Sequence, residues 1–541
     1  MNPTMDETPP APRPRTNLVQ KFATVGSATL LSRLLGFARE TLMAAALGAG
    51  PVADAFYAAF RFPNLFRRLF AEGAFNAAFV PLFAREIEAN GVDGAKKFSE
   101  EVFGVLFTVL LALTILMELA MPLIVRTIIA PGFDDPDKFA ITVAMSAIMF
   151  PYLMCMSLTA MMSGILNSLH RYFVAALAPV LLNVVLVGVL AYAVWTGADG
   201  LETGYDLSWG VLGAGLLQLM LVTLAVRRAG IRIGFRRPRM TPNVKRLLWL
   251  AFPAAITGGI TQINLVIGQM IASTKEGAIS ILQYADRVYQ LPLGVVGIAV
   301  GVVLLPELAR ALKAGHNVEA ATLQNRSVEF ALFLTLPAAA ALLVMSEELV
   351  RMLYERGAFT ADTTGSVSAA LAVFGLGLPA FVLIKAFTPG FFAREDTRTP
   401  MIFAGVSVVV NVALALTLFP VLAEAGIAAA ESTAGWVNAL LLLATLIRRG
   451  HWGSDRALLT RIPRLVLAAA LMAVFIHFAL GWLDPWLAPG SPFLRQAAAL
   501  GALIVAAMVL YFGLAFAIGG ADVGMIRRNM RRRGKGGTAT P

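Results

Sequence analysis

The sequence predicts an all-α polytopic membrane protein with 14 transmembrane helices, arranged as two parallel six-helix lobes around a central cavity plus two extra C-terminal helices. Three observations predict this class. Of the 541 residues, 58% are hydrophobic and 14% are charged, whereas soluble domains are about 45–50% apolar and about 25% charged. The apolar residues form runs of membrane-spanning length. Basic residues concentrate in alternate loops between those runs. A soluble enzyme and a disordered protein are both excluded.

Each element follows from the order of apolar runs and polar breaks. Residues 1–19 are rich in proline and polar side chains, which predicts a disordered tail and not a cleavable signal peptide. The later runs approach or exceed the ~20 residues that a helix needs to cross a bilayer. Internal proline or glycine in several of them indicates broken or tilted helices. The predicted spans are 22–48, 53–84, 102–126, 141–168, 172–196, 207–226, 247–273, 277–308, 327–350, 364–392, 400–420, 425–447, 462–483 and 496–519.

The loops predict how these spans are oriented. If the N-terminus is cytoplasmic, the cytoplasmic segments hold 31 Lys and Arg residues and the outer segments hold 6. This bias follows the positive-inside rule, and an odd number of spans would destroy it. Both termini are therefore expected in the cytoplasm. The net charge of +11 is explained mainly by topology, so we expect no nucleic-acid partner.

An internal repeat predicts the two lobes. The segment around Pro81 returns around Pro306, and the segment around Arg126 returns around Arg351, both at an offset of 225 residues. Six spans separate the copies, so both enter the membrane in the same sense. Two lobes around a cleft suit alternating access, and a duplicated scaffold without transport is the alternative. The predicted units are a first lobe at 20–228, a basic linker at 229–246, a second lobe at 247–450, two added helices at 461–520 and a basic tail at 521–541.

Charged residues inside the spans are the candidate functional residues. One cation at the centre of a bilayer costs about 2.5–3.5 kcal/mol even on the gentler scale, so these side chains must line a wet cavity or pair with acids. Pairing or snorkelling is sufficient for Arg61, Arg68 and Lys385. The counted acids are Glu40, Asp54, Glu72, Glu118 and Asp286, which leaves a surplus of two positive charges. We expect a binding function for Arg33, Arg39, Arg67 and Arg287.

The chemistry of this cluster indicates an anionic cargo. Guanidinium groups bind phosphate oxygens in pairs and stay charged at any working pH, so a diphosphate headgroup would be complementary. The chain has no phosphate-binding glycine loop, its four histidines are scattered, and Cys155 is its single cysteine. We therefore predict a protein that is not an enzyme, with no catalytic residues, no metal site and no cofactor.

Several segments closely resemble the MurJ/MviN family, and the likeness runs from about residue 20 to 525. The matching segments are Ser32–Glu40, Asp54–Phe56, Phe62–Phe75, Ala130–Phe133, Tyr284–Arg287 and Ala386–Phe391.

This resemblance implies a lipid II flippase of the MOP transporter superfamily in the bacterial cytoplasmic (inner) membrane. Such proteins move an undecaprenyl-diphosphate-linked disaccharide-pentapeptide to the outer leaflet for peptidoglycan synthesis, driven by membrane potential. The expected partners are lipid II, membrane lipids and other cell-wall synthesis proteins. The resemblance associates the two added helices with a groove for the lipid tail and places acids matching Glu40 and Asp54 in or near the cavity. It associates headgroup binding or activity with residues matching Arg33, Arg39, Arg67 and Arg287.

Three alternatives differ in testable features. A multidrug or cation antiporter would have twelve helices and an acidic cavity. An O-antigen or exopolysaccharide flippase also carries a polyprenyl diphosphate, so only the family motifs argue against it. A membrane-embedded glycosyltransferase or polymerase would need paired carboxylates on a large outer loop, and the outer loops here are short.

Overall fold

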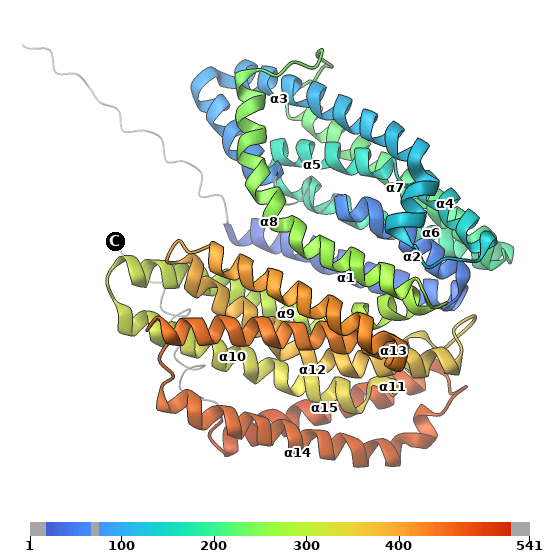
Figure 1. Cartoon of the computed structure of the whole chain (residues 1–541), viewed down its shortest axis with the longest axis vertical. Helices are drawn as coiled ribbons and strands as arrows, with labels where there is room; N and C mark the ends of the chain where they lie inside the picture. Colours follow the sequence, from blue (N-terminus) through green and yellow to red (C-terminus); the bar gives the residue numbers. More distant parts are fainter. Residues whose placement is uncertain (1–17, 67–74, 521–541) are drawn as a thin grey trace, which may run out of the picture.

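The structure is a computed structural model that describes residues 18–66 and 75–520. Within these ranges every regular element is a helix, in agreement with the predicted class. The helices lie roughly side by side in two stacked groups (Figure 1). We call the helices of the first half of the chain the N-lobe and those from α8 to α13 the C-lobe.

The described part of the N-lobe contains eight helical elements. They are α1 (Leu18–Leu47), α2 (Pro51–Phe66), α3 (Phe75–Ile124), the π-helical turn η2 (Val125–Ile129), α4 (Pro136–Met149), α5 (Tyr152–Ser168), α6 (Tyr172–Thr196) and α7 (Gly200–Arg228).

The C-lobe and the C-terminal addition contain eight further helices. They are α8 (Pro242–Ala272), α9 (Ala278–Lys313), α10 (Asn317–Val344), α11 (Ser346–Tyr354), α12 (Ala361–Phe392), α13 (Arg398–Arg448), α14 (Arg456–Leu487) and α15 (Phe493–Ala517).

Two long helices contain a bend and each covers parts of two predicted spans. Gly91 (φ 66°) divides α3, and Ala423 (φ 50°) divides α13. Nine helical stretches of the described residues are long and apolar enough to cross a membrane, so the chain is a multi-pass membrane protein. With the two bends, and with α1, α8 and α9 at their predicted places, the helices are consistent with 14 spans.

Several predicted spans have different limits in the structure, for example those predicted at 327–350 and 141–168. The span predicted at 327–350 begins earlier, because α10 is helical from Asn317, and it ends at Val344. A separate short helix, α11, follows Met345 and carries two acids in its first turn. The span predicted at 141–168 is formed by α4 and α5, which Pro151 separates.

Side-chain caps explain where several helices begin. Asp199 accepts a hydrogen bond from the backbone N–H of Glu202 at 2.7 Å, and Asp455 accepts one from Leu458 at 2.7 Å. Such caps satisfy backbone N–H groups that the first turn leaves without a partner. Both caps lie ahead of the spans predicted at 207–226 and 462–483, so α7 and α14 begin earlier than the apolar runs predict.

Helices α1 and α8 contact both lobes. Helix α1 lies between the two groups (Figure 1), where it packs on α6 and also contacts α9 and α11. Helix α8 packs on α3 and on α13. Its cap Thr241 donates to Glu101 of α3 at 2.9 Å, and Asn411 of α13 donates to Asn264 in its second half at 2.8 Å. Near its end, Gln269 donates to the carbonyl of Ile129 in η2 at 2.7 Å.

The added helices α14 and α15 pack together at the edge of the C-lobe (Figure 1). A buried apolar cluster that includes Leu465, Leu500 and Tyr511 joins them to residues of α10 and α11. At one end, Glu329 of α10 accepts a hydrogen bond from Arg461 of α14 at 2.7 Å and is paired with Arg326. The addition is therefore anchored to the C-lobe by both apolar packing and ion pairs.

Candidate functional site

A buried polar network joins the lobes at the end of the bundle where α1 ends and α2, α4, α9 and α12 begin, here called the sealed end. Asp54 of α2 is fully buried. Its Oδ2 accepts from Lys138 Nζ at 2.8 Å and from the backbone N–H of Gly277 at 2.7 Å. Its Oδ1 accepts from the N–H of Ser280 at 3.0 Å and from its hydroxyl at 2.8 Å. One N-lobe carboxylate thus caps the first turn of α9 in the C-lobe, where a helix N-terminus favours negative charge.

Backbone contacts complete the closure of the sealed end. The Tyr284 hydroxyl donates to the carbonyl of Gly48 at 2.8 Å, and the N–H of Ala358 donates to the carbonyl of Ala45 at 2.8 Å. Gly357 has φ 62°, and a Cβ there would overlap the carbonyl of Ala45. Only glycine combines this left-handed backbone with so close an approach. The lobes are therefore locked together at this end.

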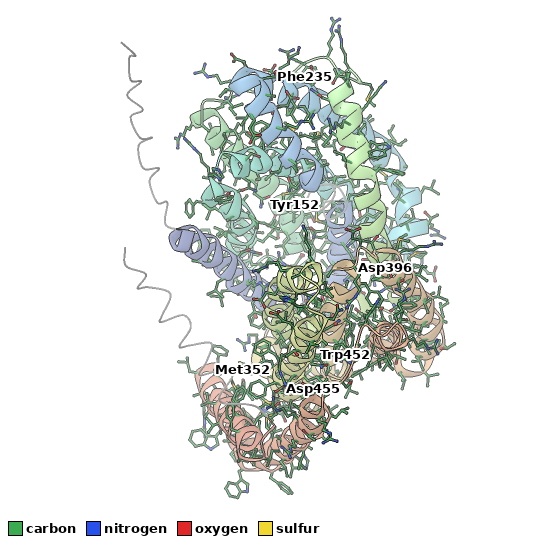
Figure 2. All side chains as sticks on the ribbon, turned by 90° about the vertical axis from the view of Figure 1, so that its left-hand side faces the viewer. Tyr152, Phe235, Met352, Asp396, Trp452 and Asp455 are labelled. Atoms are coloured by element: carbon green, nitrogen blue, oxygen red, sulfur yellow. The ribbon has the colours of Figure 1, made fainter. Side chains whose placement is uncertain are left out.

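A polar cavity of about 390 Å³ lies between the lobes. This volume falls within the ~300–1,000 Å³ typical of small-molecule sites. Residues of α1, α2, α5, α6 and α7 line it from the N-lobe, and residues of α8, α9 and α13 line it from the C-lobe. Tyr152 of α5 is one of the N-lobe lining residues (Figure 2).

The N-lobe wall holds an arginine in a fixed orientation. Arg39 is 8% exposed; its Nη2 donates to Glu40 at 2.5 Å and its Nη1 donates to Asn183 of α6 at 3.2 Å. Tyr57 of α2 donates to the second oxygen of Glu40 at 2.6 Å. The Nε of Arg39 is buried and has no hydrogen-bond partner among the described residues. A donor without a partner in the described part of the chain therefore lies in the N-lobe wall of the cavity.

The C-lobe wall of the cavity carries both positively and negatively charged side chains. Arg287 of α9 packs against Gly36 of α1 so closely that a Cβ at Gly36 would overlap its guanidinium group. Asp286 and Glu431 of α13 line the same cavity. Arg61 of α2 crosses between the lobes and donates to Gln283 of α9 at 3.1 Å. Positive groups from both lobes therefore meet in one cavity.

The predicted site residues lie in three different places. Arg33 is exposed on α1, and its guanidinium lies against Gly294 of α9, but it is outside the cavity lining. Asp54 lies in the sealed end. The predictions for Arg67, Arg68 and Glu72 lie outside the described residues. The structure brings together around the cavity Arg39, Glu40, Arg61, Asp286 and Arg287.

Sequence reasoning missed two groups of residues. Glu431 lines the cavity but was absent from the count of intramembrane acids, so the predicted positive surplus was too large; a single acid in the span 425–447 was the available signal. Lys138 was assigned to an outer loop, whereas it is 6% exposed and paired with Asp54. The two residues are 84 positions apart in the sequence, so the sequence alone does not indicate that they form a pair.

Comparison with known proteins identifies the family. The family model described as lipid II flippase MurJ matches residues 43–497. A probable lipid II flippase MurJ of Rhizobium meliloti (strain 1021) is 71% identical over 517 residues, covering 95% of this chain and 97% of the relative. The lipid II flippase MurJ of Burkholderia cenocepacia is 35% identical and covers 93% of this chain and 98% of its own length.

Solved structures share the fold. A lipid II flippase MurJ in an inward closed conformation matches with a TM-score of 0.75 at 24% identity, over 91% of this chain and 97% of the other. An inward-facing MATE family transporter of the MOP superfamily matches with a TM-score of 0.65 at 16% identity, over 79% and 97% of the two chains. The family model and the relatives cover most of the sequence. The chain belongs to the lipid II flippase MurJ family.

Proposed function

We propose that this chain is a lipid II flippase, which moves an undecaprenyl-diphosphate-linked disaccharide-pentapeptide from the inner to the outer leaflet of the bacterial inner membrane by alternating access. Membership of the family supports this function, and so does a cavity between two lobes that are joined at one end. We assign the substrate to that cavity and the membrane to the apolar surfaces of the helices.

The observation that carries the proposal is the pair of arginines that face one cavity from different lobes. Arg39 projects from α1 with an unpaired Nε, and Arg287 projects from α9. Two guanidinium groups can each offer parallel N–H donors to a diphosphate. We assign Arg33 and Arg67 to the same headgroup path, with Glu40 holding Arg39 in position and with Asp286, Asp54, Arg61, Arg68 and Glu72 in supporting roles.

The arrangement suggests how the cycle proceeds. We place both termini and the basic loops in the cytoplasm, so the sealed end faces outward. The headgroup enters from the cytoplasmic side and neutralises the arginines, while its lipid tail stays in the bilayer. The sealed end then parts and the opposite end closes. After release, an inside-negative membrane potential favours the inward return of the positive cavity.

The added helices are assigned to the lipid tail. Helices α14 and α15 lie at the edge of the C-lobe, and their outward side chains, including Phe478, Val505 and Val509, are exposed and apolar. Such a surface is compatible with a polyprenyl chain lying along residues 461–520.

The basic linker is assigned to membrane headgroups and cell-wall synthesis proteins. Its exposed arginines, including Arg237 and Arg239, point out of the bundle, and basic segments beside a membrane attract anionic lipid.

Depletion of the protein in a strain without other flippases tests the function. Lipid II should accumulate in the inner leaflet, and wild-type protein should restore it to the outer leaflet. Arg39→Gln and Arg287→Gln should not restore it when they reach wild-type levels in the membrane. Normal outer-leaflet lipid II after depletion would contradict the function, and full rescue by both variants would contradict the role of the arginines.

A flippase for another polyprenyl-diphosphate saccharide remains the second candidate, because the same arginines would bind its diphosphate. Rescue of O-antigen or exopolysaccharide export, but not of lipid II transport, would favour it. The likeness to the MATE transporter concerns the fold alone, and a cavity with arginines from both lobes would repel a cationic drug.

A further inference from the structure

We propose that the cavity contains a neutral sugar subsite, which recognises the saccharide of the cargo separately from its diphosphate. The inference rests on the proposed function, because a polyprenyl-diphosphate cargo brings a saccharide into this cavity. The subsite is made of carboxamide side chains, three from each lobe. They are Asn64, Asn183 and Gln218 of the N-lobe and Gln262, Gln283 and Gln290 of the C-lobe.

Contacts within the walls account for part of this set: Asn183 accepts from Arg39, Gln283 accepts from Arg61, and Gln290 donates to Asp286. The remaining hydrogen-bonding capacity around the cavity requires an explanation. A neutral polar side chain in an apolar environment costs free energy unless it finds hydrogen-bond partners. Diphosphate binding does not explain them, because arginine provides stronger, charge-assisted donors. A carboxamide offers both donors and an acceptor without charge. Sugar hydroxyl and acetamido groups need this mixture of donors and acceptors.

Gln218 provides the most specific evidence. Its side chain is fully buried, lines the cavity, and donates from Nε2 to the carbonyl of Ala178 at 2.6 Å. That hydrogen bond fixes which side of the amide is oxygen. The Oε1 atom has no hydrogen-bond partner among the described residues. An acceptor without a partner in the described ranges is therefore held beside the cavity, and we assign it to a hydroxyl or acetamido N–H of the cargo.

Aromatic rings lie beside the carboxamides. Phe60 of α2 and Tyr152 of α5 both line the cavity, with ring centroids 6.3 Å apart, and Phe56 stacks on Phe60 at 5.9 Å. Ligand sites combine such apolar rings with a few placed polar groups. A sugar ring has apolar C–H faces and a polar edge, so it fits a wall of this composition.

The subsite has consequences for selectivity and for closure of the lobes. A site built to hydrogen-bond a substrate group rejects analogues that lack the group, because its buried polar atoms are then unpaired. The carboxamides therefore select among polyprenyl diphosphates by their saccharide. One of them, Gln283, already links the lobes through Arg61. A saccharide that contacts carboxamides of both lobes therefore favours a shorter distance between the lobes.

Binding measurements on the purified full-length protein in lipid nanodiscs test the subsite. The two probes are lipid II and undecaprenyl diphosphate, which carries no sugar. Gln218→Met keeps the length of the side chain but removes both its acceptor and its hydrogen bond to Ala178. Loss of one hydrogen bond should weaken lipid II binding roughly fivefold and leave undecaprenyl diphosphate binding unchanged. Gln324→Met is the matched control, because Gln324 is fully buried with an unpartnered amide outside the cavity. It should bind both probes as the wild type does.

Gln262→Met tests the opposite wall and keeps the experiment decisive if Gln218→Met does not fold. Selective loss of lipid II binding in either variant supports the subsite. Equal losses for both probes, or unchanged lipid II binding in the folded variants, overturn it. The proposed function has a separate readout: wild-type protein that binds neither probe, or Arg39→Gln protein that binds both normally, contradicts diphosphate capture itself.

Discussion

Asp54 accepts a 2.7 Å hydrogen bond from the backbone N–H of Gly277, so a buried acid of one lobe caps the first helix turn of the other. Lys138 completes the charge balance from α4. At the sealed end, one carboxylate of α2 therefore contacts both α4 and the start of α9. Opening this end must break its hydrogen bonds to the C-lobe together.

Asp54→Asn should weaken the sealed end. Lys138 would stay buried without its counter-charge, and removal of one partner from a buried ion pair costs about 3–5 kcal/mol. With Cys155→Ala as background, a cysteine at Gln283 in the cavity reports access from outside to a membrane-impermeant thiol reagent. We expect faster labelling in the Asp54→Asn protein. Asp137→Asn, an exposed acid at the same end, should leave the labelling rate unchanged, and equal rates in all proteins would contradict the role of Asp54.

Gly36→Ala should impair transport without removing a charge. A Cβ at Gly36 would overlap the guanidinium of Arg287, which is the end of a flexible side chain and can move away at little cost in stability. We expect Arg287 to shift and the variant to rescue growth of a depleted strain poorly at normal membrane levels. Gly188→Ala on α6 meets no atom within 4 Å and should rescue fully. Full rescue by both variants would show that the position of Arg287 is unimportant.

Glu329→Gln should loosen the added helices. The substitution removes the charge that pairs with Arg461 of α14 and Arg326 of α10, and hydrogen bonds to charged groups contribute about 1.5–3 kcal/mol each. We expect a lower midpoint of thermal unfolding and faster proteolysis between α13 and α14. Glu319→Gln, an exposed acid on the same helix, should match the wild type. An unchanged cleavage rate in the Glu329 variant would refute this anchoring.

Asp396 should contribute stability that depends on pH. It lies between α12 and α13 (Figure 2), where the backbone N–H and hydroxyl of Thr399 and the guanidinium of Arg449 donate to it. These contacts lower the pKa of Asp396 from 3.8 to about 2. Because the folded-state pKa is depressed, the stabilisation is complete above the unfolded value and is lost as the pH falls toward 2.

The measurement compares thermal unfolding of the wild type and Asp396→Asn. The wild type should melt higher at neutral pH, and the difference should shrink between about pH 4 and pH 2. Glu395→Gln, at the exposed neighbouring residue, provides the control and should show a smaller difference. A gap between wild type and Asp396→Asn that stays constant down to pH 2 would exclude a titrating Asp396 as its cause.

Some cavity residues could be predicted from the sequence. A charged residue inside an apolar run costs free energy in the membrane, so it is easy to recognise as a functional candidate. Arg39 and Glu40 interrupt a hydrophobic run and do line the cavity. The pairing partners could not be predicted, since Lys138 meets Asp54 only through the packing of α4 on α2. Gln218 gave no signal for a related reason: one neutral amide scarcely changes the hydropathy of a span, and its role depends on what faces it in three dimensions.

The limits of the helices could also be predicted only in part. The apolar runs located most helices, and the bend at Ala423 lies in the break predicted between 420 and 425, whereas the break at Met345 falls inside the single span predicted at 327–350. At Ala423 the charged neighbour Glu424 marks the turn in the sequence, whereas the apolar run before Met345 gives no sign that the helix stops there. A hydropathy pattern records which residues avoid water and contains little information about where the chain turns within the same environment.

Helix α8 has three hydrogen-bonded attachments, and they are divided between the two lobes. Its start is tied to α3 through Thr241, its second half to α13 through Asn264, and its last turn to η2 through Gln269. A helix that is attached near both ends to one lobe and at an intermediate residue to the other lobe cannot follow both lobes when they rotate apart. A rotation of the lobes would bend α8 or release the Asn264 or Gln269 attachment, so we expect this helix to resist their separation.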